Sequence, residues 1–143
     1  MKVNISADFR YGTNNNDEFK DLPYLNEEQR QFFTLFVESV ANDKPLIGKN
    51  KTSWQDNQGK NIPETEFYQQ HHFWHYHSGP YKTGETPECY TYNLEWNIKG
   101  LTSSAIIHYQ KLSEQDITLL AYSPKHIPFP KIQDSNNPLL DRV

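Results

Sequence analysis

Apolar residues recur at helical spacing in one segment of the chain, YLNEEQRQFFTLFVESVAN (residues 24–42). The apolar positions lie three and four residues apart, as on one face of an amphipathic helix, and comprise Phe32, Phe33, Leu35, Phe36, Val37 and Val40. Asn26 stands where an N-cap is expected, and Glu27 and Glu28 follow in the first turn, where acidic residues favour the helix dipole. The pattern predicts a helix over residues 26–41.

In five other segments the apolar residues recur at every second position, which is typical of half-buried strands. These segments are residues 3–9, 67–77, 90–98, 103–111 and 116–122. The last two flank a hairpin-length loop, LSEQ, and predict an antiparallel meander. An irregular tail over the sheet is predicted by Pro124, Pro128, Pro130 and Pro138. We therefore expect an α+β fold in a single domain, residues 1–143, with one main amphipathic helix packed on a small antiparallel β-sheet.

The stretch HHFWHYH (residues 71–77) contains four of the six histidines. Because side chains alternate along a strand, His71, Phe73, His75 and His77 would share one face, and His72, Trp74 and Tyr76 the other. We expect the aromatic face to pack on the core. The other face would then gather imidazoles, whose pKa near neutrality is suited to acid–base chemistry.

Charge and cysteine content restrict the classes of function. The net charge of -4 argues against a dedicated nucleic-acid coat protein, yet residues 44–63 carry four lysines against Asp56 alone and form one basic loop. Cys89 is the only cysteine, which excludes an internal disulfide and a zinc site built on several cysteines, and favours a cytoplasmic location. No apolar run approaches the roughly 18 residues of a membrane span, so no membrane partner is expected.

The histidines allow three interpretations. His75 and His77 could bind a metal ion with an H-x-H spacing that resembles that of cupin barrels, although the next acid, Glu85, lies eight residues further on. They could instead cleave RNA, with a base that takes the 2′-hydroxyl proton, an acid that protonates the leaving 5′-oxygen and a cation that supports the phosphorane. Further candidates for proton transfer are His108, His126, Tyr109 and Tyr76. In the third interpretation the histidines are hydrogen-bonded polar residues of the sheet.

The order of several motifs adds a family resemblance. Five segments follow one another between about residues 22 and 137. They are a helix that begins with acidic residues (LNEEQRQFFTLFVESV), a loop (DKPLIGKNKTSW), a strand with WHYH, and the segments LTSSAIIHYQK and ITLLAYSPKH. This arrangement resembles the YafO-type toxins of bacterial toxin-antitoxin systems, which belong to the RelE/ParE group of small toxins that cleave messenger RNA. The positions that carry it are His75, His77, Ala105, Tyr109 and Pro124.

The resemblance implies a RelE-like fold and a ribosome-dependent endoribonuclease, an mRNA interferase that inhibits translation. Its implied partners are a cognate antitoxin protein, the ribosome and messenger RNA, and it implies no cofactor and no metal. Under this hypothesis the catalytic residues are His75, His77, Tyr109 and His126, and the RNA-binding residues are Lys49, Lys51, Lys82, Lys125 and Arg142. The alternatives are a non-enzymatic protein-binding module, encoded by a phage or plasmid, and a metal-dependent small-barrel enzyme.

Overall fold

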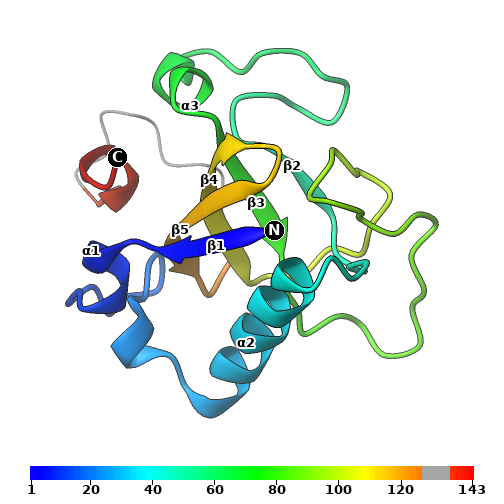
Figure 1. Cartoon of the computed structure of the whole chain (residues 1–143), viewed down its shortest axis with the longest axis horizontal. Helices are drawn as coiled ribbons and strands as arrows, with labels where there is room; N and C mark the ends of the chain where they lie inside the picture. Colours follow the sequence, from blue (N-terminus) through cyan, green and yellow to red (C-terminus); the bar gives the residue numbers. More distant parts are fainter. Residues whose placement is uncertain (127–135) are drawn as a thin grey trace.

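A five-stranded sheet in the order β1-β5-β4-β3-β2 forms the centre of the fold (Figure 1). The structure is a computed structural model that describes residues 1–126 and 136–143. The strands are β1 (Lys2–Ile5), β2 (Asn50–Thr52), β3 (Phe73–His77), β4 (Ile106–Ser113) and β5 (Asp116–Ser123). The antiparallel pairing of β2 to β5 agrees with the expected meander, but β1 pairs parallel with β5 at the sheet edge. The α+β class is therefore confirmed, whereas the purely antiparallel sheet is wrong, because a long connection lets the first and last strands run parallel.

The helices in the described part of the chain are α1 (Ala7–Arg10), α2 (Glu27–Ala41) and α3 (Glu66–Gln70), with short 3-10 helices η1 (Leu22–Tyr24) and η2 (Pro138–Asp141). The predicted helix is confirmed by α2. Its N-cap side chain Asn26 Oδ1 accepts from Gln29 N at 2.8 Å, and Gln29 Oε1 accepts from Asn26 N at 2.9 Å, which completes a capping box. None of the helices described is long and apolar enough to cross a membrane.

Helix α2 covers one face of the sheet, here called the helix face (Figure 1). The ring of Phe36 stacks on Tyr76 with a centroid distance of 4.9 Å, and Phe33 meets Phe9 of α1 edge-on at 5.7 Å. Beneath α2 the sheet supplies Tyr76, Ile107, Tyr109, Ile117 and Leu119, which are at most 3% exposed. Each such side chain contributes about 1.5–3 kcal/mol by burial. The aromatic face of β3 packs on this core, as expected.

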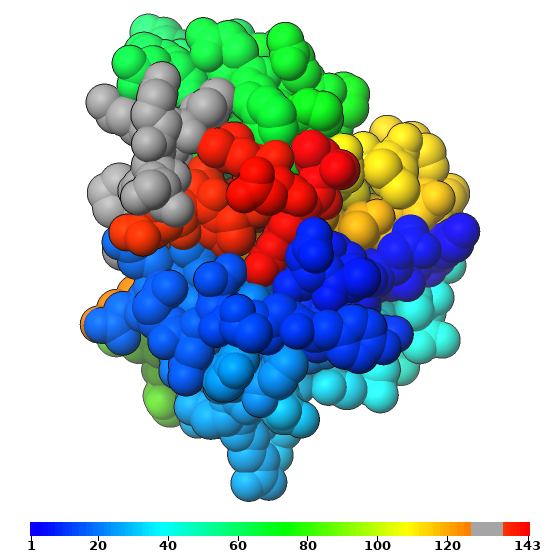
Figure 2. Space-filling model, turned by 90° about the vertical axis from the view of Figure 1, so that its left-hand side faces the viewer, coloured from blue at the N-terminus to red at the C-terminus, as the bar shows by residue number. Residues whose placement is uncertain are grey.

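A second, smaller cluster lies on the opposite face of the sheet. It consists of Phe19, Tyr68, Phe73, Leu120, Ala121 and Leu139. A β-bulge makes it possible, because His108 pairs with Ala121 while Tyr109 pairs with Leu119, which leaves Leu120 as an extra residue. Figure 2 shows the segment that contains η2 on the surface between the N-terminal segment and the region of α3. The chain end thus closes one half of this face, and the other half carries the histidines.

The segment 90–98 is not a strand, contrary to its alternating pattern. It forms turns in which Asn93 and Leu94 adopt positive φ angles of 53° and 52°, and only isolated bridges join Thr91 to Leu46 and Asn97 to Asn50. Positive φ is incompatible with extended backbone. Leu94 is nevertheless buried at 1% exposure, because the turn places it in the core cluster of the helix face.

The predicted basic loop of residues 44–63 contains the short strand β2, and α3 begins shortly after it. Three residues, Asn50–Thr52, are too few to produce a visible period, and they contain no apolar side chain. They are nevertheless buried, because β2 forms the edge that pairs with β3. Of the predicted irregular tail, residues 127–135 lie outside the described part of the chain.

Candidate functional site

Strand β3 places part of the histidine stretch on the opposite face. Phe73, His75 and His77 alternate along this face and are 1%, 3% and 2% exposed. The prediction that these three residues share a face is confirmed, whereas His71 and His72 precede the strand, at the end of α3. Both faces of β3 are buried, so His75 and His77 are not surface residues of a solvated sheet.

The lysines join the histidines because of strand register. Lys51 of β2 pairs directly with His75 of β3, and the carbonyl of Lys49 accepts a hydrogen bond from His77 N at 2.9 Å. A hollow of about 530 Å³ opens here and is lined by Lys49, Lys51, His75, His77 and His126, among others. We call this hollow, defined by those five residues, the histidine cleft.

The backbone of Ser103 holds the imidazole of His77. The Nδ1 atom of His77 lies 3.0 Å from Ser103 N and 2.9 Å from Ser103 O. One tautomer accepts from the amide and the other donates to the carbonyl, so both neutral tautomers are supported. The Nε2 atom is buried and has no hydrogen-bond partner among the described residues. His77 can therefore present to the cleft either a lone pair or an N–H group.

Burial keeps His77 neutral. It lowers the pKa of His77 to about 4, an effect that the hydrogen bond with Ser103 partly offsets and that the nearby charges of His126, Lys49 and Lys51 reinforce. At neutral pH the side chain is thus an uncharged imidazole, which can accept a proton but cannot donate one as an imidazolium.

His75 and His108 form a buried cross-strand pair behind His77. They are directly opposite each other on β3 and β4, and each is near a serine: His75 Nδ1 lies 3.1 Å from Ser53 Oγ, and His108 Nε2 lies 2.7 Å from Ser123 Oγ. Burial, and next the charge of His108, hold the pKa of His75 well below its usual value. Burial likewise lowers the pKa of His108 to about 3. The pair is a neutral polar layer, in which His75 lines the cleft and His108 lies next to it on β4.

Two lysine ammonium groups converge on one oxygen atom. Lys49 Nζ donates to Asn57 Oδ1 at 2.9 Å, and Lys51 Nζ donates to the same atom at 3.1 Å. Lys51 is only 7% exposed, and its ammonium also lies 5.7 Å from the ring centroid of Trp96. Burial, followed by the charge of Lys49, lowers the pKa of Lys51 to about 8. The cleft therefore combines the uncharged imidazole of His77 with Lys51, which is still mostly protonated at neutral pH.

His126 closes the outer side of the cleft. It follows β5 and is exposed, and its ring stacks on that of His77 at 5.3 Å with an interplanar angle of 24°. A second hollow, of about 480 Å³, is also lined by Lys49, His77 and His126, together with Ser103. These three residues thus form a ridge shared by two hollows.

Tyr109 lies away from the other predicted catalytic residues. It is fully buried on the helix face, where its ring is 6.3 Å from that of Phe36, and its hydroxyl donates to Asn50 Oδ1 at 2.7 Å. Burial holds its pKa well above the usual value. Adjacent residues on β4 point to opposite faces, so His108 lies on the histidine side and Tyr109 does not.

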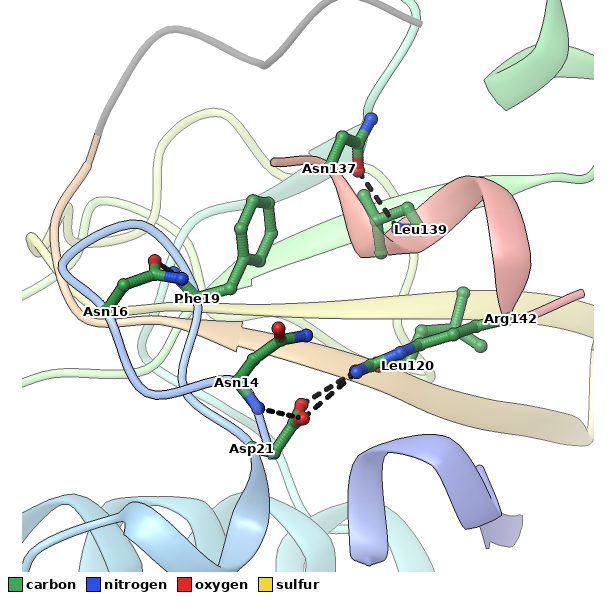
Figure 3. A network of polar contacts seen from close by, with 8 residues as sticks. All are labelled: Asn14, Asn16, Phe19, Asp21, Leu120, Asn137, Leu139 and Arg142. Carbon is green, nitrogen blue, oxygen red and sulfur yellow. Dashed lines mark hydrogen bonds and ion pairs between the residues drawn. The ribbon is translucent and has the colours of Figure 1, made fainter. Parts of the chain in front are cut away.

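Arg142 is engaged in holding the chain end (Figure 3). Its Nη1 lies 2.9 Å from Asp21 Oδ1 and donates to the carbonyl of Leu120 at 2.7 Å, while Nη2 donates to Asp21 Oδ2 at 3.1 Å. The side chains of Arg142 and Asp21 are 6% and 1% exposed, and Asp21 Oδ2 also accepts from Asn14 N at 2.9 Å. The structure does not bring Arg142 to the histidine cleft.

The two other predicted RNA-binding residues are exposed. Lys82 lies in the loop after β3. Lys125 precedes His126 in the sequence, and its Nζ forms an exposed ion pair with Asp17 Oδ2 at 3.3 Å. Of the nine predicted residues, the structure brings together His75, His77, His126, Lys49 and Lys51.

Three residues that hold the cleft together were not predicted from the sequence. Ser53 and Ser103 contact the imidazoles, and Asn57 bridges the lysines. They lie in turns or irregular segments and carry no periodic signal. His108 was a candidate for proton transfer, but its place opposite His75 depends on the register of β3 and β4, which the sequence does not show.

Neither the possible metal ligands nor the comparisons with known proteins assign a function to the cleft. The described residues contain no group of three or more histidine, cysteine, aspartate or glutamate side chains arranged to hold a metal ion. No model of a protein family, no curated protein and no solved structure matches this chain significantly, so the geometry of the histidine cleft is the basis for proposing a function.

Proposed function

We propose that the histidine cleft cleaves RNA by acid–base catalysis, and that the protein is a YafO-like, RelE-type mRNA interferase toxin. The observation that carries the proposal is the convergence of an imidazole held by the backbone and two lysine side chains in one open cleft. Phosphodiester cleavage needs a base and positive charge at the same place. The family resemblance and the H-x-H spacing of His75 and His77 support the same assignment.

His77 is the proposed base. When Nδ1 donates to the carbonyl of Ser103, the lone pair of Nε2 faces the cleft and can take the proton of a ribose 2′-hydroxyl. The 2′-oxygen then attacks the phosphorus and the bond to the 5′-oxygen breaks, which leaves a 2′,3′-cyclic phosphate and a 5′-hydroxyl. A pKa of about 4 makes His77 a weak base, so its contribution depends on accurate positioning.

Lys49 and Lys51 supply the positive charge. Their ammonium groups reach the same point and would stabilise the non-bridging oxygens of the phosphorane. Lys51, with a pKa of about 8, is protonated at neutral pH and acidic enough to deliver the proton that the leaving 5′-oxygen requires. The exposed ring of His126 offers a surface on which an RNA base can stack.

The ribosome, messenger RNA and a cognate antitoxin are the proposed partners. With a net charge of -4, the chain has little general attraction for RNA, so a host that holds the messenger would supply much of the orientation. Both hollows beside the shared ridge are open to solvent, which suits a strand presented by another particle.

Induction in a bacterium tests the proposal. Wild-type protein should arrest growth and protein synthesis, and His77→Gln and Lys51→Gln should each abolish the arrest while the protein remains folded by circular dichroism. Lys44→Gln is the matched control, because it removes an exposed charge from the same basic loop outside the cleft. Arrest by the His77→Gln and Lys51→Gln proteins, or growth unaffected by the wild type, would refute the assignment.

A second candidate function is protein binding without catalysis. A hollow of about 220 Å³ beside α2 is lined mainly by apolar residues, among them Phe32, Leu35, Ile47 and Tyr81. Leu35 is 58% exposed, so this apolar surface is open to a partner. On this alternative, induction of the wild type would be harmless, and Leu35→Glu would remove a binding partner while the cleft variants would not.

A further inference from the structure

The bridge from Lys49 and Lys51 to Asn57 has a feature that a structural contact does not require. Two ammonium groups share one neutral amide oxygen, and the nearby carboxylate of Asp56 offsets only part of their mutual repulsion, because the charge of Lys49 lowers the pKa of Lys51 more than the charge of Asp56 raises it. Each ammonium carries donors that are normally matched to anions or water. We infer that Asn57 Oδ1 occupies the position of a phosphate oxygen, and that the Asn57 side chain is a displaceable placeholder in an anion site.

A second observation in the same cleft points to a missing ligand. His77 lines the cleft, and its Nε2 atom is buried and has no hydrogen-bond partner among the described residues. Buried polar atoms are usually paired, so such an atom marks a place where a ligand atom or water is expected. The lysines and this nitrogen would contact the same phosphodiester group, with its oxygen on the lysines and its ribose hydroxyl on His77.

The turn that carries Asn57 is held by hydrogen bonds, while the Asn57 side chain is exposed. Asp56 fixes the turn, since its Oδ1 accepts from Gln58 N at 2.9 Å and from Lys60 N at 3.0 Å. Asn57 itself is exposed, so a rotation about its side-chain bonds can remove the amide from the lysines without unfolding the turn. A ligand therefore has to replace two charge-assisted hydrogen bonds, which weakens its binding.

The ligand class follows from the chemistry of the site. Two lysine ammonium groups that contact one oxygen atom bind a charged phosphate oxygen more strongly than a neutral amide oxygen. That this phosphate belongs to an RNA backbone rests on the proposed function. Removal of the Asn57 side chain should then strengthen anion binding. If Asn57 instead positions the lysines for the ligand, its removal should weaken binding.

Binding measurements without cleavage test the inference. The probes are inorganic phosphate and a single-stranded trinucleotide with 2′-O-methyl groups, which cannot be cleaved, and their dissociation constants are measured by NMR titration. The variants are Asn57→Ala, Asn57→Asp and the double variant Lys49→Gln/Lys51→Gln. Asn61→Ala is the control, because it truncates an exposed asparagine in the same loop.

The inference predicts that Asn57→Ala binds both probes about three- to tenfold more tightly than the wild type, which corresponds to the loss of weak, partly exposed competing bonds. Asn57→Asp should bind more weakly, the double lysine variant should not bind, and Asn61→Ala should match the wild type. Weaker or unchanged binding by Asn57→Ala, or no binding by any variant, overturns the inference. Because no cleavage is measured, a harmless wild type with tighter binding by Asn57→Ala would reject the toxin and retain the anion site.

Discussion

The histidines of the cleft are distinguished by what surrounds each ring. His77 is held by the peptide of Ser103, which supports either tautomer, while His75 and His108 form a neutral layer between two serines. Identical side chains thus have different chemical roles, because burial disfavours their charged form to different extents. His77 combines a ring held by the backbone with a buried Nε2 atom that has no hydrogen-bond partner among the described residues.

Acid should destabilise the protein through these residues. The folded-state pKa is about 4 for His77 and about 3 for His108, both below the unfolded value of 6.5. The unfolded chain then binds more protons, so stability is complete above pH 6.5 and falls as the pH drops toward the folded-state pKa values. In this window each histidine should contribute a slope of about 1.4 kcal/mol per pH unit.

Urea unfolding between pH 7 and 5 measures that slope. His77→Gln should reduce the slope by the contribution of one histidine. NMR of the imidazole nitrogens should show His77 and His108 neutral throughout the range. An imidazolium signal from either residue near pH 6 would contradict the account.

At the scale of elements, β3 and β4 position the histidines, and both strands were predicted from their alternating patterns. Helix α2 and strands β3, β4 and β5 follow the apolar spacing of the sequence, and alternation alone placed His75 and His77 on one face. The lysines could not be placed in this way, because β2 has three residues and no apolar signal. The role of Tyr109 was predicted without the register that puts it under α2.

A buried ion pair anchors the chain at the C-terminal end of the 3-10 helix η2. Arg142 contacts both carboxylate oxygens of Asp21 and the carbonyl of Leu120, which lies at the β-bulge (Figure 3). Arg142→Gln would leave a buried carboxylate without its partner, at a cost of roughly 3–5 kcal/mol. The free energy of unfolding in urea measures this loss.

A double variant tests whether the loss comes from the unpaired carboxylate. Asp21→Asn combined with Arg142→Gln should recover part of the lost stability, because no unpaired charge remains. A change below about 1 kcal/mol for Arg142→Gln would show that the pair is not structural, since exposed ion pairs contribute no more than this.

The whole molecule is acidic, and two of its 14 lysine and arginine residues meet where the proposed reaction needs positive charge. The net charge of -4 coexists with Lys49 and Lys51 on one face of the sheet, a contrast that neither the total charge nor the sequence order of the lysines shows. Pairing of β2 with β3 creates it, by placing Lys51 opposite His75. A localised cation pair contacts one phosphate without giving the protein a general affinity for nucleic acid.

The most direct measurement of the central claim is the chemistry of RNA ends. Translating ribosomes on a defined messenger are incubated with purified wild-type or His77→Gln protein, and new 5′-hydroxyl ends are mapped by sequencing. We predict 5′-hydroxyl ends within the messenger for the wild type and a loss of about 100-fold or more for His77→Gln, as expected for removal of a general base. Equal cleavage by both proteins, or no new ends with the wild type, would contradict the account.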